Sequence, residues 1–215
     1  MDHQQEPLRN EENENGYIQT SSQAYVSRQA NLYGPKNVVL LGKTVIQPGC
    51  IIRGDFESMI TVGRYCHFEN GTILRPSYTL LPPTKTSKDK TSISALSSSQ
   101  QIDDWSVQYL PMFIGSHTRI GSNCVIEAAS IGSNVRIGKD CVISPRAIVK
   151  DVCIVEDDTV IPPDMVVPPF SRVRGKPGRI VEHSLPESAA IELEKVAVTS
   201  FRQFVRDLES ESNVS

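Results

Sequence analysis

The sequence predicts an all-β solenoid, a parallel β-helix of hexapeptide repeats with one C-terminal α-helix packed along it. The first observation behind this prediction is a fixed period in the aliphatic residues. A six-residue period fits neither the 3.6-residue turn of a helix nor simple alternation along a strand. It fits a triangular coil in which each repeat forms one flat side. The periodic residues are Ile114, Ile120, Ile126, Ile131, Ile137, Ile143, Val149, Ile154, Val160, Val167 and Val173.

The second observation concerns the fourth residue after each aliphatic position, where a tight corner leaves room only for a small inward side chain. Asp158 is the one residue there that does not fit this expectation. The small slots downstream are Thr118, Cys124, Val135, Cys141, Ala147, Cys153, Asp158 and Ser171. The same frame continues upstream through Leu40, Ile46, Ile52, Val62, Phe68 and Leu74, with Thr44, Cys50, Phe56, Cys66 and Thr72 in the small slots.

An ordinary β-sandwich with scattered valines is the alternative fold. Hairpin chains of that kind need Asn-Gly or Asp-Gly turns between alternating strands. Within the repeats Asn70-Gly71 is the only such pair, and it does not separate two alternating strands; Asn15-Gly16 precedes the first repeat. The periodicity therefore favours the solenoid.

The repeat divides the chain into one domain with two tails and an insertion. Residues 1–16 are acidic and poor in apolar residues, which predicts a disordered tail. The β-helix is expected over 17–180. It is interrupted at 77–106 by a segment with twelve Ser or Thr, which predicts a flexible loop on one corner.

A helix is expected at 184–209, followed by a short tail at 210–215. Ser184, Pro186 and Glu187 form a helix-start pattern with a capping box. Apolar residues then recur every three or four positions and predict that the helix docks on the solenoid, although an exposed stripe kept for a partner is the alternative. These residues are Ala190, Leu193, Ala197, Phe201, Phe204 and Leu208, widened by Ile191, Val198 and Val205.

Composition excludes several function classes. The net charge of −3 and the pI near 5.8 give no general attraction to phosphate backbones, so nucleic-acid binding is not expected. No apolar run is long enough to span a membrane and no signal-peptide pattern is present, which predicts a cytoplasmic protein without membrane insertion. The five cysteines occupy small inward slots without a Cys-x-x-Cys motif, so we expect buried free thiols. These are Cys50, Cys66, Cys124, Cys141 and Cys153.

The repeats resemble the left-handed β-helix superfamily, which includes hexapeptide acyltransferases and γ-class carbonic anhydrases. Residues 50–55 (Cys-Ile-Ile-Arg-Gly-Asp) and Val62-Gly63 are similar to the carbonic anhydrase branch. Residues 17–20, 26–29 and 37–44, together with the proline-rich end at 162–170, more narrowly resemble the dynactin subunit 5 family.

The carbonic anhydrase resemblance implies a zinc site of three imidazoles with one open position. Carried onto this sequence, the three ligand positions fall on Arg75, Ser122 and Glu127. None is histidine, and an arginine cannot ligate a cation. The sequence therefore predicts no metal, no cofactor and no catalytic residues. The four histidines, His3, His67, His117 and His183, are interpreted as surface or turn residues.

The resemblance implies a non-enzymatic subunit of the dynactin pointed-end complex, associated with the cytoskeleton, that supports dynein-dependent transport and early-endosome attachment. Its implied partners are subunit 6, subunit 4 and the pointed-end actin-related protein, and indirectly dynein and cargo adaptors. The alternative is a trimeric enzyme homologue, either like a γ-class carbonic anhydrase or like a hexapeptide acyltransferase with His117 as the candidate base.

Six residues are candidates for an interaction or structural role. Arg53 and Asp55 are expected to form an ion pair on the solenoid wall, where such a pair contributes little unless it is networked. Trp105 ends the insertion and is interpreted either as a partner anchor or as packing on the wall. The other candidates are Phe170 in the proline-rich end and the helix residues Phe201 and Phe204.

Overall fold

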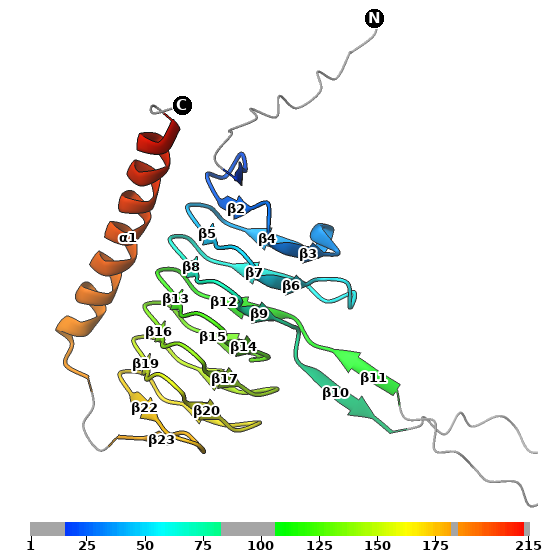
Figure 1. Cartoon of the computed structure of the whole chain (residues 1–215). Coiled ribbons are helices and arrows are strands. Elements are labelled where there is room, and N and C mark those ends of the chain that lie inside the picture. Colours follow the sequence, from blue (N-terminus) through cyan, green and yellow to red (C-terminus); the bar gives the residue numbers. More distant parts are fainter. Residues whose placement is uncertain (1–15, 83–105, 182–184, 213–215) are drawn as a thin grey trace, which may run out of the picture.

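The computed structural model describes residues 16–82, 106–181 and 185–212 and confirms the predicted fold class. It is a β-solenoid of stacked three-sided coils with one long helix along its side (Figure 1). The acidic tail at 1–15 and Trp105 lie outside the described residues, as do His3 and His183.

The outer surface of the solenoid has three faces, each formed by one sheet. We call them the helix-covered face, the aliphatic face and the third face. The helix-covered face consists of β1 (Tyr17–Gln19), β2 (Tyr25–Ser27), β5 (Val45–Ile46), β8 (His67–Phe68), β13 (Arg119–Ile120), β16 (Arg136–Ile137), β19 (Ile154–Val155), β22 (Arg172–Arg174) and β23 (Arg179–Ile180).

The other two faces are six-stranded and parallel throughout. The aliphatic face consists of β3 (Asn31–Tyr33), β6 (Ile51–Arg53), β9 (Ile73–Leu74), β14 (Val125–Ile126), β17 (Val142–Ile143) and β20 (Val160–Ile161). The third face consists of β4 (Val38–Leu40), β7 (Ile60–Val62), β12 (Met112–Ile114), β15 (Ser130–Ile131), β18 (Ile148–Val149) and β21 (Val166–Val167), and the 3-10 turn η1 (Pro35–Asn37) precedes β4.

Each coil adds one strand to each face, so identical positions stack in register. Ile120, for example, lies between Phe68 and Ile137 in neighbouring coils. Because side chains alternate along a strand, one residue of each short strand points inward and its neighbour points outward. The inward residues are almost fully buried and form one continuous core along the axis of the solenoid.

The corners show why small residues recur. All five cysteines are buried free thiols, as predicted, and burial raises the pKa of Cys66 to about 12. The Cys66 thiol donates to the Gly115 carbonyl at 3.1 Å, and the Thr118 hydroxyl donates to Gly132 at 3.0 Å. At Gly132 an added Cβ would lie 2.7 Å from the Asp151 nitrogen in the next coil. The coils therefore approach too closely for a side chain at this position.

The structure corrects the repeat register after Val149. The sequence frame placed Ile154 and Val160 inward, but Val155 and Ile161 are the buried residues. This shift restores an unbroken six-residue step from Val149 to Val173. The shift also explains why a charged residue appeared in a small inward slot. Counted from Val155, the slot is the buried Thr159, and Asp158 is an exposed corner residue with φ 58°.

The prediction that Phe56 occupies an inward slot is wrong. The corner between β6 and β7 is longer than those of the regular repeats, and Gly54 and Ser58 are its buried residues. Phe56 is half-buried and stacks outside the core on Tyr109.

The two ends of the segment predicted as a flexible loop are instead ordered strands. β10 (Tyr78–Leu81) pairs antiparallel with β11 (Ser106–Tyr109) as a hairpin that projects from the solenoid (Figure 1). Its base is fixed because the Leu110 N–H donates to the Ser77 carbonyl, and Arg146 donates to the Tyr78 carbonyl at 3.0 Å. The serine-rich centre of the insertion lies outside the described residues.

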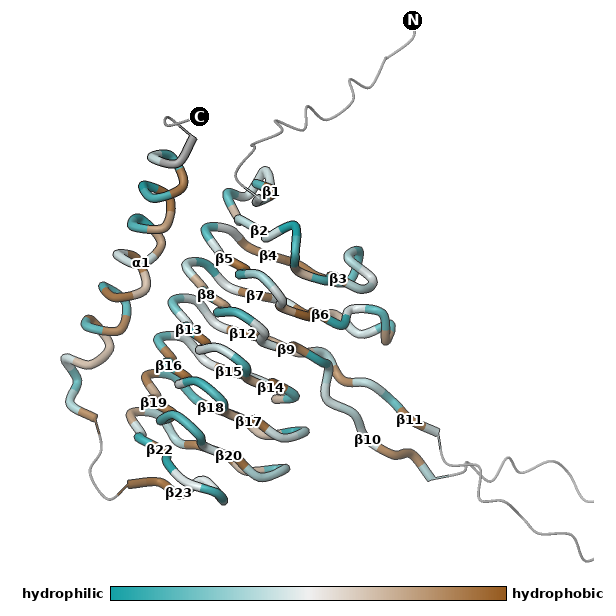
Figure 2. Tube along the Cα trace, in the orientation of Figure 1, coloured by the Kyte–Doolittle hydropathy of each residue, from teal (hydrophilic) through white to brown (hydrophobic). Residues whose placement is uncertain are grey.

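The helix α1 (Ser188–Ser212) begins and ends a few residues later than the predicted 184–209, and therefore extends into the segment predicted as a tail. Its start is displaced because the Leu185 N–H donates to the Phe170 carbonyl at 2.7 Å and holds the preceding segment at a corner. The predicted docking on the solenoid is confirmed. In the upper turns of α1 the hydrophobic residues lie toward the solenoid (Figure 2), although Ile191 is exposed.

Candidate functional site

The structure brings together two of the three positions where the carbonic anhydrase resemblance implies zinc ligands. Arg75 directly follows β9 and Glu127 directly follows β14, and these strands are neighbours in register. The Arg75 Nε donates to Glu127 Oε1 at 2.5 Å, and an Arg75 terminal nitrogen contacts the same oxygen. Glu127 is 11% exposed and Arg75 48% exposed at the side chain. Ser122 lies apart from them, at the corner between β13 and β14.

These residues do not fit a zinc ion. A guanidinium has no lone pair to donate and its charge opposes a cation, while Glu127 already accepts from Arg75. Within the described ranges, no three His, Cys, Asp or Glu side chains lie close enough to hold a metal ion. An ion pair between neighbouring coils thus occupies the place where the resemblance implies a metal.

The two described histidines lie in different surroundings. His117 is a corner residue with φ 58° whose ring stacks on Tyr65 at 5.5 Å. His67 lies beneath α1, where burial, together with the nearby Arg119 charge, lowers its pKa to about 4 despite the opposing effect of Glu69. Its Nδ1 is buried without a hydrogen-bond partner. Both rings therefore take part in packing contacts, His117 with Tyr65 and His67 with Phe204.

Aromatic contacts attach the C-terminal half of α1 to the helix-covered face. The Phe204 ring packs against Tyr17 at 5.0 Å and Tyr25 at 5.6 Å between centroids. Phe201 packs against Tyr65 at 5.7 Å in an edge-to-face arrangement. Such pairs stabilise beyond the area that they bury. The predicted candidates Phe201 and Phe204 therefore lie in an intramolecular contact.

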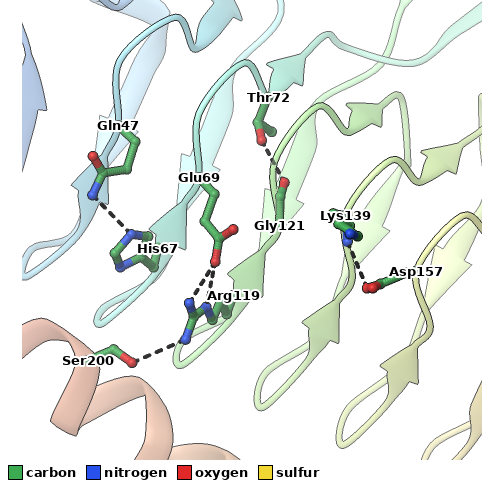
Figure 3. Close-up of polar contacts among 9 residues, drawn as sticks. All are labelled: Gln47, His67, Glu69, Thr72, Arg119, Gly121, Lys139, Asp157 and Ser200. Atoms are coloured by element: carbon green, nitrogen blue, oxygen red, sulfur yellow. Dashed lines mark hydrogen bonds and ion pairs between the residues drawn. The ribbon is translucent and has the colours of Figure 1, made fainter.

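The middle of α1 lies over polar side chains. Arg119 donates to Glu69 at 2.7 Å and to the Ser200 hydroxyl of the helix at 3.4 Å (Figure 3). A cavity of about 390 Å³ lies between the helix and the sheet there, lined on one side by Arg136 and on the other by Leu193 and other residues. The helix-covered face is thus closely packed at one end and loosely packed at the other.

The aliphatic face carries an unbroken outward row of β-branched residues. Each member immediately precedes an inward core residue and therefore points away from the core. Register places the members side by side across five coils. We call this set the aliphatic row: Ile51, Ile73, Val125, Val142 and Val160.

The charges that border the aliphatic row are already paired. Arg75 and Glu127 form one pair, and Arg53 donates twice to Asp55 at 2.8 Å, as the sequence predicted. The Arg53 hydrogen bonds lower the pKa of the Asp55 carboxyl. A partner covering this face therefore does not need to supply counter-charges.

The remaining predicted candidate, Phe170, is a corner residue with φ 56° whose carbonyl accepts from Leu185. The aliphatic row was not among the predicted candidates. The sequence contains the signal for this row, because the residue before the inward position is Ile or Val in five of the six strands of this face; the exception is Asn31 in β3. Only the register reveals that these residues share a face.

The fold and the stacked corners define the class of protein: a parallel β-helix of hexapeptide repeats. Solved structures of this class are similar to the chain. A hexapeptide transferase family protein from Anaplasma phagocytophilum matches with a TM-score of 0.55 at 15% identity, covering 84% of this chain and 90% of that chain. A mutant of perosamine N-acetyltransferase from Caulobacter crescentus matches with a TM-score of 0.52 at 13% identity, covering 74% and 57%. At such identities the likeness concerns the fold alone.

Sequence comparison then identifies the family. The family model described as Dynactin subunit 5 matches residues 8–208. Dynactin subunit 5 from Dictyostelium discoideum is 41% identical over 115 residues, which are 54% of this chain and 46% of that protein. The match thus spans about half the length of that relative. The chain belongs to the dynactin subunit 5 family.

Among the described residues, no helix is long and apolar enough to cross a membrane.

Proposed function

We propose that this chain is a non-enzymatic assembly subunit of the dynactin complex that binds its neighbours through the aliphatic face. The observation that carries the proposal is an outward row of five Ile and Val side chains, unbroken by charge, which α1 leaves uncovered. Rows of this kind on a rigid, flat surface suit protein contacts. Family membership supports dynactin as the assembly.

The partners proposed for this surface are subunit 6, subunit 4 and the pointed-end actin-related protein. Through them the chain would support dynein-dependent transport and early-endosome attachment, at a cytoplasmic, cytoskeleton-associated location. The enclosed core and the paired charges support a structural role, because they leave the surface flat and electrically balanced for docking.

Recovery of the assembly tests this function directly. The full-length chain, tagged at one end and purified from its own cells, is expected to bring down the other dynactin subunits, as read by mass spectrometry. Deleting the gene should impair dynein-driven movement of early endosomes while leaving growth metabolism intact. Normal endosome movement together with a recovery free of dynactin subunits would contradict the proposal.

The enzymatic alternative has its own test. We expect less than stoichiometric zinc in protein purified without chelator, and no CO₂ hydration, because the Arg75–Glu127 pair occupies the inherited ligand positions. Elemental analysis measures the metal. One zinc per chain with hydration activity would show that the chain is a carbonic anhydrase homologue after all.

A further inference from the structure

A second surface lies where the projecting hairpin meets the coils. The Arg53 guanidinium lies over the Tyr33 ring at 5.2 Å and over the Phe56 ring at 4.5 Å. Phe56 stacks on Tyr109 with centroids 4.2 Å apart, and Tyr109 contacts Tyr78 at 6.4 Å. These contacts connect the second coil to the base of the hairpin.

The hairpin carries the same surface outward. Tyr78 pairs with Tyr109, and Leu80 pairs with Val107 two residues further along. Because side chains alternate along a strand, all four lie on one side of the hairpin. Leu80 and Val107 are 54% and 52% exposed. We call the whole set the aromatic strip: Tyr33, Arg53, Phe56, Tyr78, Leu80, Val107 and Tyr109.

A two-stranded hairpin with one apolar side is marginally stable until a third strand or another element covers it. In this chain the solenoid covers the apolar side of the hairpin only at its base, where Phe56 stacks on Tyr109. Within the part of the chain that the structure describes, β10 and β11 pair only with each other. The edge of β11 and the edge of β10 beyond Tyr78, whose carbonyl accepts from Arg146, are therefore open. The hairpin therefore offers both backbone groups and apolar side chains to a further strand.

The size and the charge of the aromatic strip indicate which kind of partner can bind it. A stable subunit interface has roughly 20 to 30 residues on each side, whereas the strip has seven, so it fits a short segment rather than a second copy of the chain. Its charges are already balanced, because Arg53 donates twice to Asp55. Tyr, Arg and Phe are residue types that dominate binding energy at interfaces.

We propose that the hairpin binds an extended, largely uncharged segment of a partner protein, which adds as a third strand and lays alternate apolar side chains on the aromatic strip. This inference rests on the proposed function, since the partner belongs to the same assembly. It concerns a different surface from the aliphatic row.

Site-specific crosslinking in the purified assembly tests the proposal. A photo-reactive residue replaces Leu80 in the full-length chain, and the matched control replaces Gln108, which lies on the opposite side of the hairpin. We expect position 80 to crosslink to one short segment of another subunit at several times the yield of position 108. Hydrogen exchange should show amides of β10 or β11 slowed about ten-fold in the assembly relative to the isolated chain.

The outcomes separate this proposal from the proposed function. Crosslinks from position 80 that stay within this chain, or reach a second copy of it, would overturn the docking of a partner segment. Crosslinks to a partner without slowed hairpin amides would overturn the added strand. Recovery of the assembly without either signal leaves the proposed function intact and refutes the hairpin site, whereas failure to recover any assembly refutes both.

Discussion

The helix-covered face and the aliphatic face consist of strands from the same coils, yet their outward residues differ. In the helix-covered face, Tyr25, Val45 and His67 lie beneath the aromatic end of α1, and the row continues through Arg119, Arg136, Ile154 and Arg172. In the coils that contain Val45 to Ile154, the aliphatic row contains only Ile and Val, and Asn31 occupies the equivalent position in the first coil. The chain therefore covers its more polar face with its own helix and leaves the apolar one open.

The contacts of α1 differ along its length, from aromatic pairs near its C-terminal end to polar contacts in its middle. Phe201 and Phe204 meet a group of rings in the first coils, whereas the middle of the helix lies over Arg119 and a cavity. A chain that functioned alone would reduce its free energy by covering the aliphatic row. We infer that the open face is kept for another protein.

The largest expected loss of stability affects both faces, because it disturbs the stacking of the coils that form them. Gly132→Ala introduces a Cβ 2.7 Å from the Asp151 backbone nitrogen, which forces two coils apart and should lower the free energy of unfolding by about 2 to 4 kcal/mol. Chemical denaturation measures this loss. The control is Gly178→Ala, where φ, as at Gly132, lies outside the left-handed range and the nearest atom to the added Cβ is the Val160 carbonyl oxygen at 3.1 Å. Equal losses in the two variants would show that coil spacing is not the cause.

A second effect, of similar size, is confined to the helix-covered face. Replacing Phe201 and Phe204 together by Ala removes the ring contacts with Tyr17, Tyr25 and Tyr65. Both rings are half-buried, so we expect a loss of about 2 to 4 kcal/mol in total rather than the value for two fully buried rings. The melting temperature should fall while binding through the aliphatic face persists. The control Ile191→Ala, on the exposed side of the helix, should change the melting temperature little. If the double variant kept its melting temperature but lost partner binding, Phe201 and Phe204 would instead belong to the partner surface.

The smallest expected effect is a pH dependence of the same contact. Burial lowers the pKa of His67 from 6.5 to about 4, so the folded state favours the neutral ring. Stability from this group is full above about pH 6.5 and declines as the pH falls from there toward 4, because the unfolded chain binds the proton more readily. His67→Gln should flatten the fall in melting temperature in that window. If the melting temperature varied with pH identically in the unmodified chain and the His67→Gln variant, His67 would not be the source of the pH dependence.

Much of the fold was predictable from the sequence because it depends on a local period. Inward residues such as Ile120 and Ile137 repeat every sixth or so position, and the small corner slots follow from the same geometry. The register after Val149 is not predictable in this way. In Ile154-Val155 and Val160-Ile161 both adjacent residues are aliphatic, so hydrophobicity alone does not tell which points inward. Burial of Val155 decides it.

The surfaces were less predictable. Arg53 and Asp55 are two residues apart, and their ion pair could be expected from the sequence. The stacking of Phe56 on Tyr109 joins residues on either side of the insertion, and no local pattern indicates it. The aliphatic row exists only once five coils are aligned, so its residues show no spacing of their own apart from that of the repeat.

The central claim is that the open aliphatic face holds the chain in its assembly, and a matched pair of lysine substitutions tests it most directly. Val142→Lys places a charge in the middle of the aliphatic row, and Ile148→Lys places one at an outward position of the third face in the same coil. Both positions are outward and half-buried, so both variants should fold. Quantitative recovery of dynactin subunits by the tagged chains should fall at least about ten-fold for Val142→Lys and stay near the unmodified level for Ile148→Lys. Equal recovery by the two variants, or a greater loss with Ile148→Lys, would contradict the account.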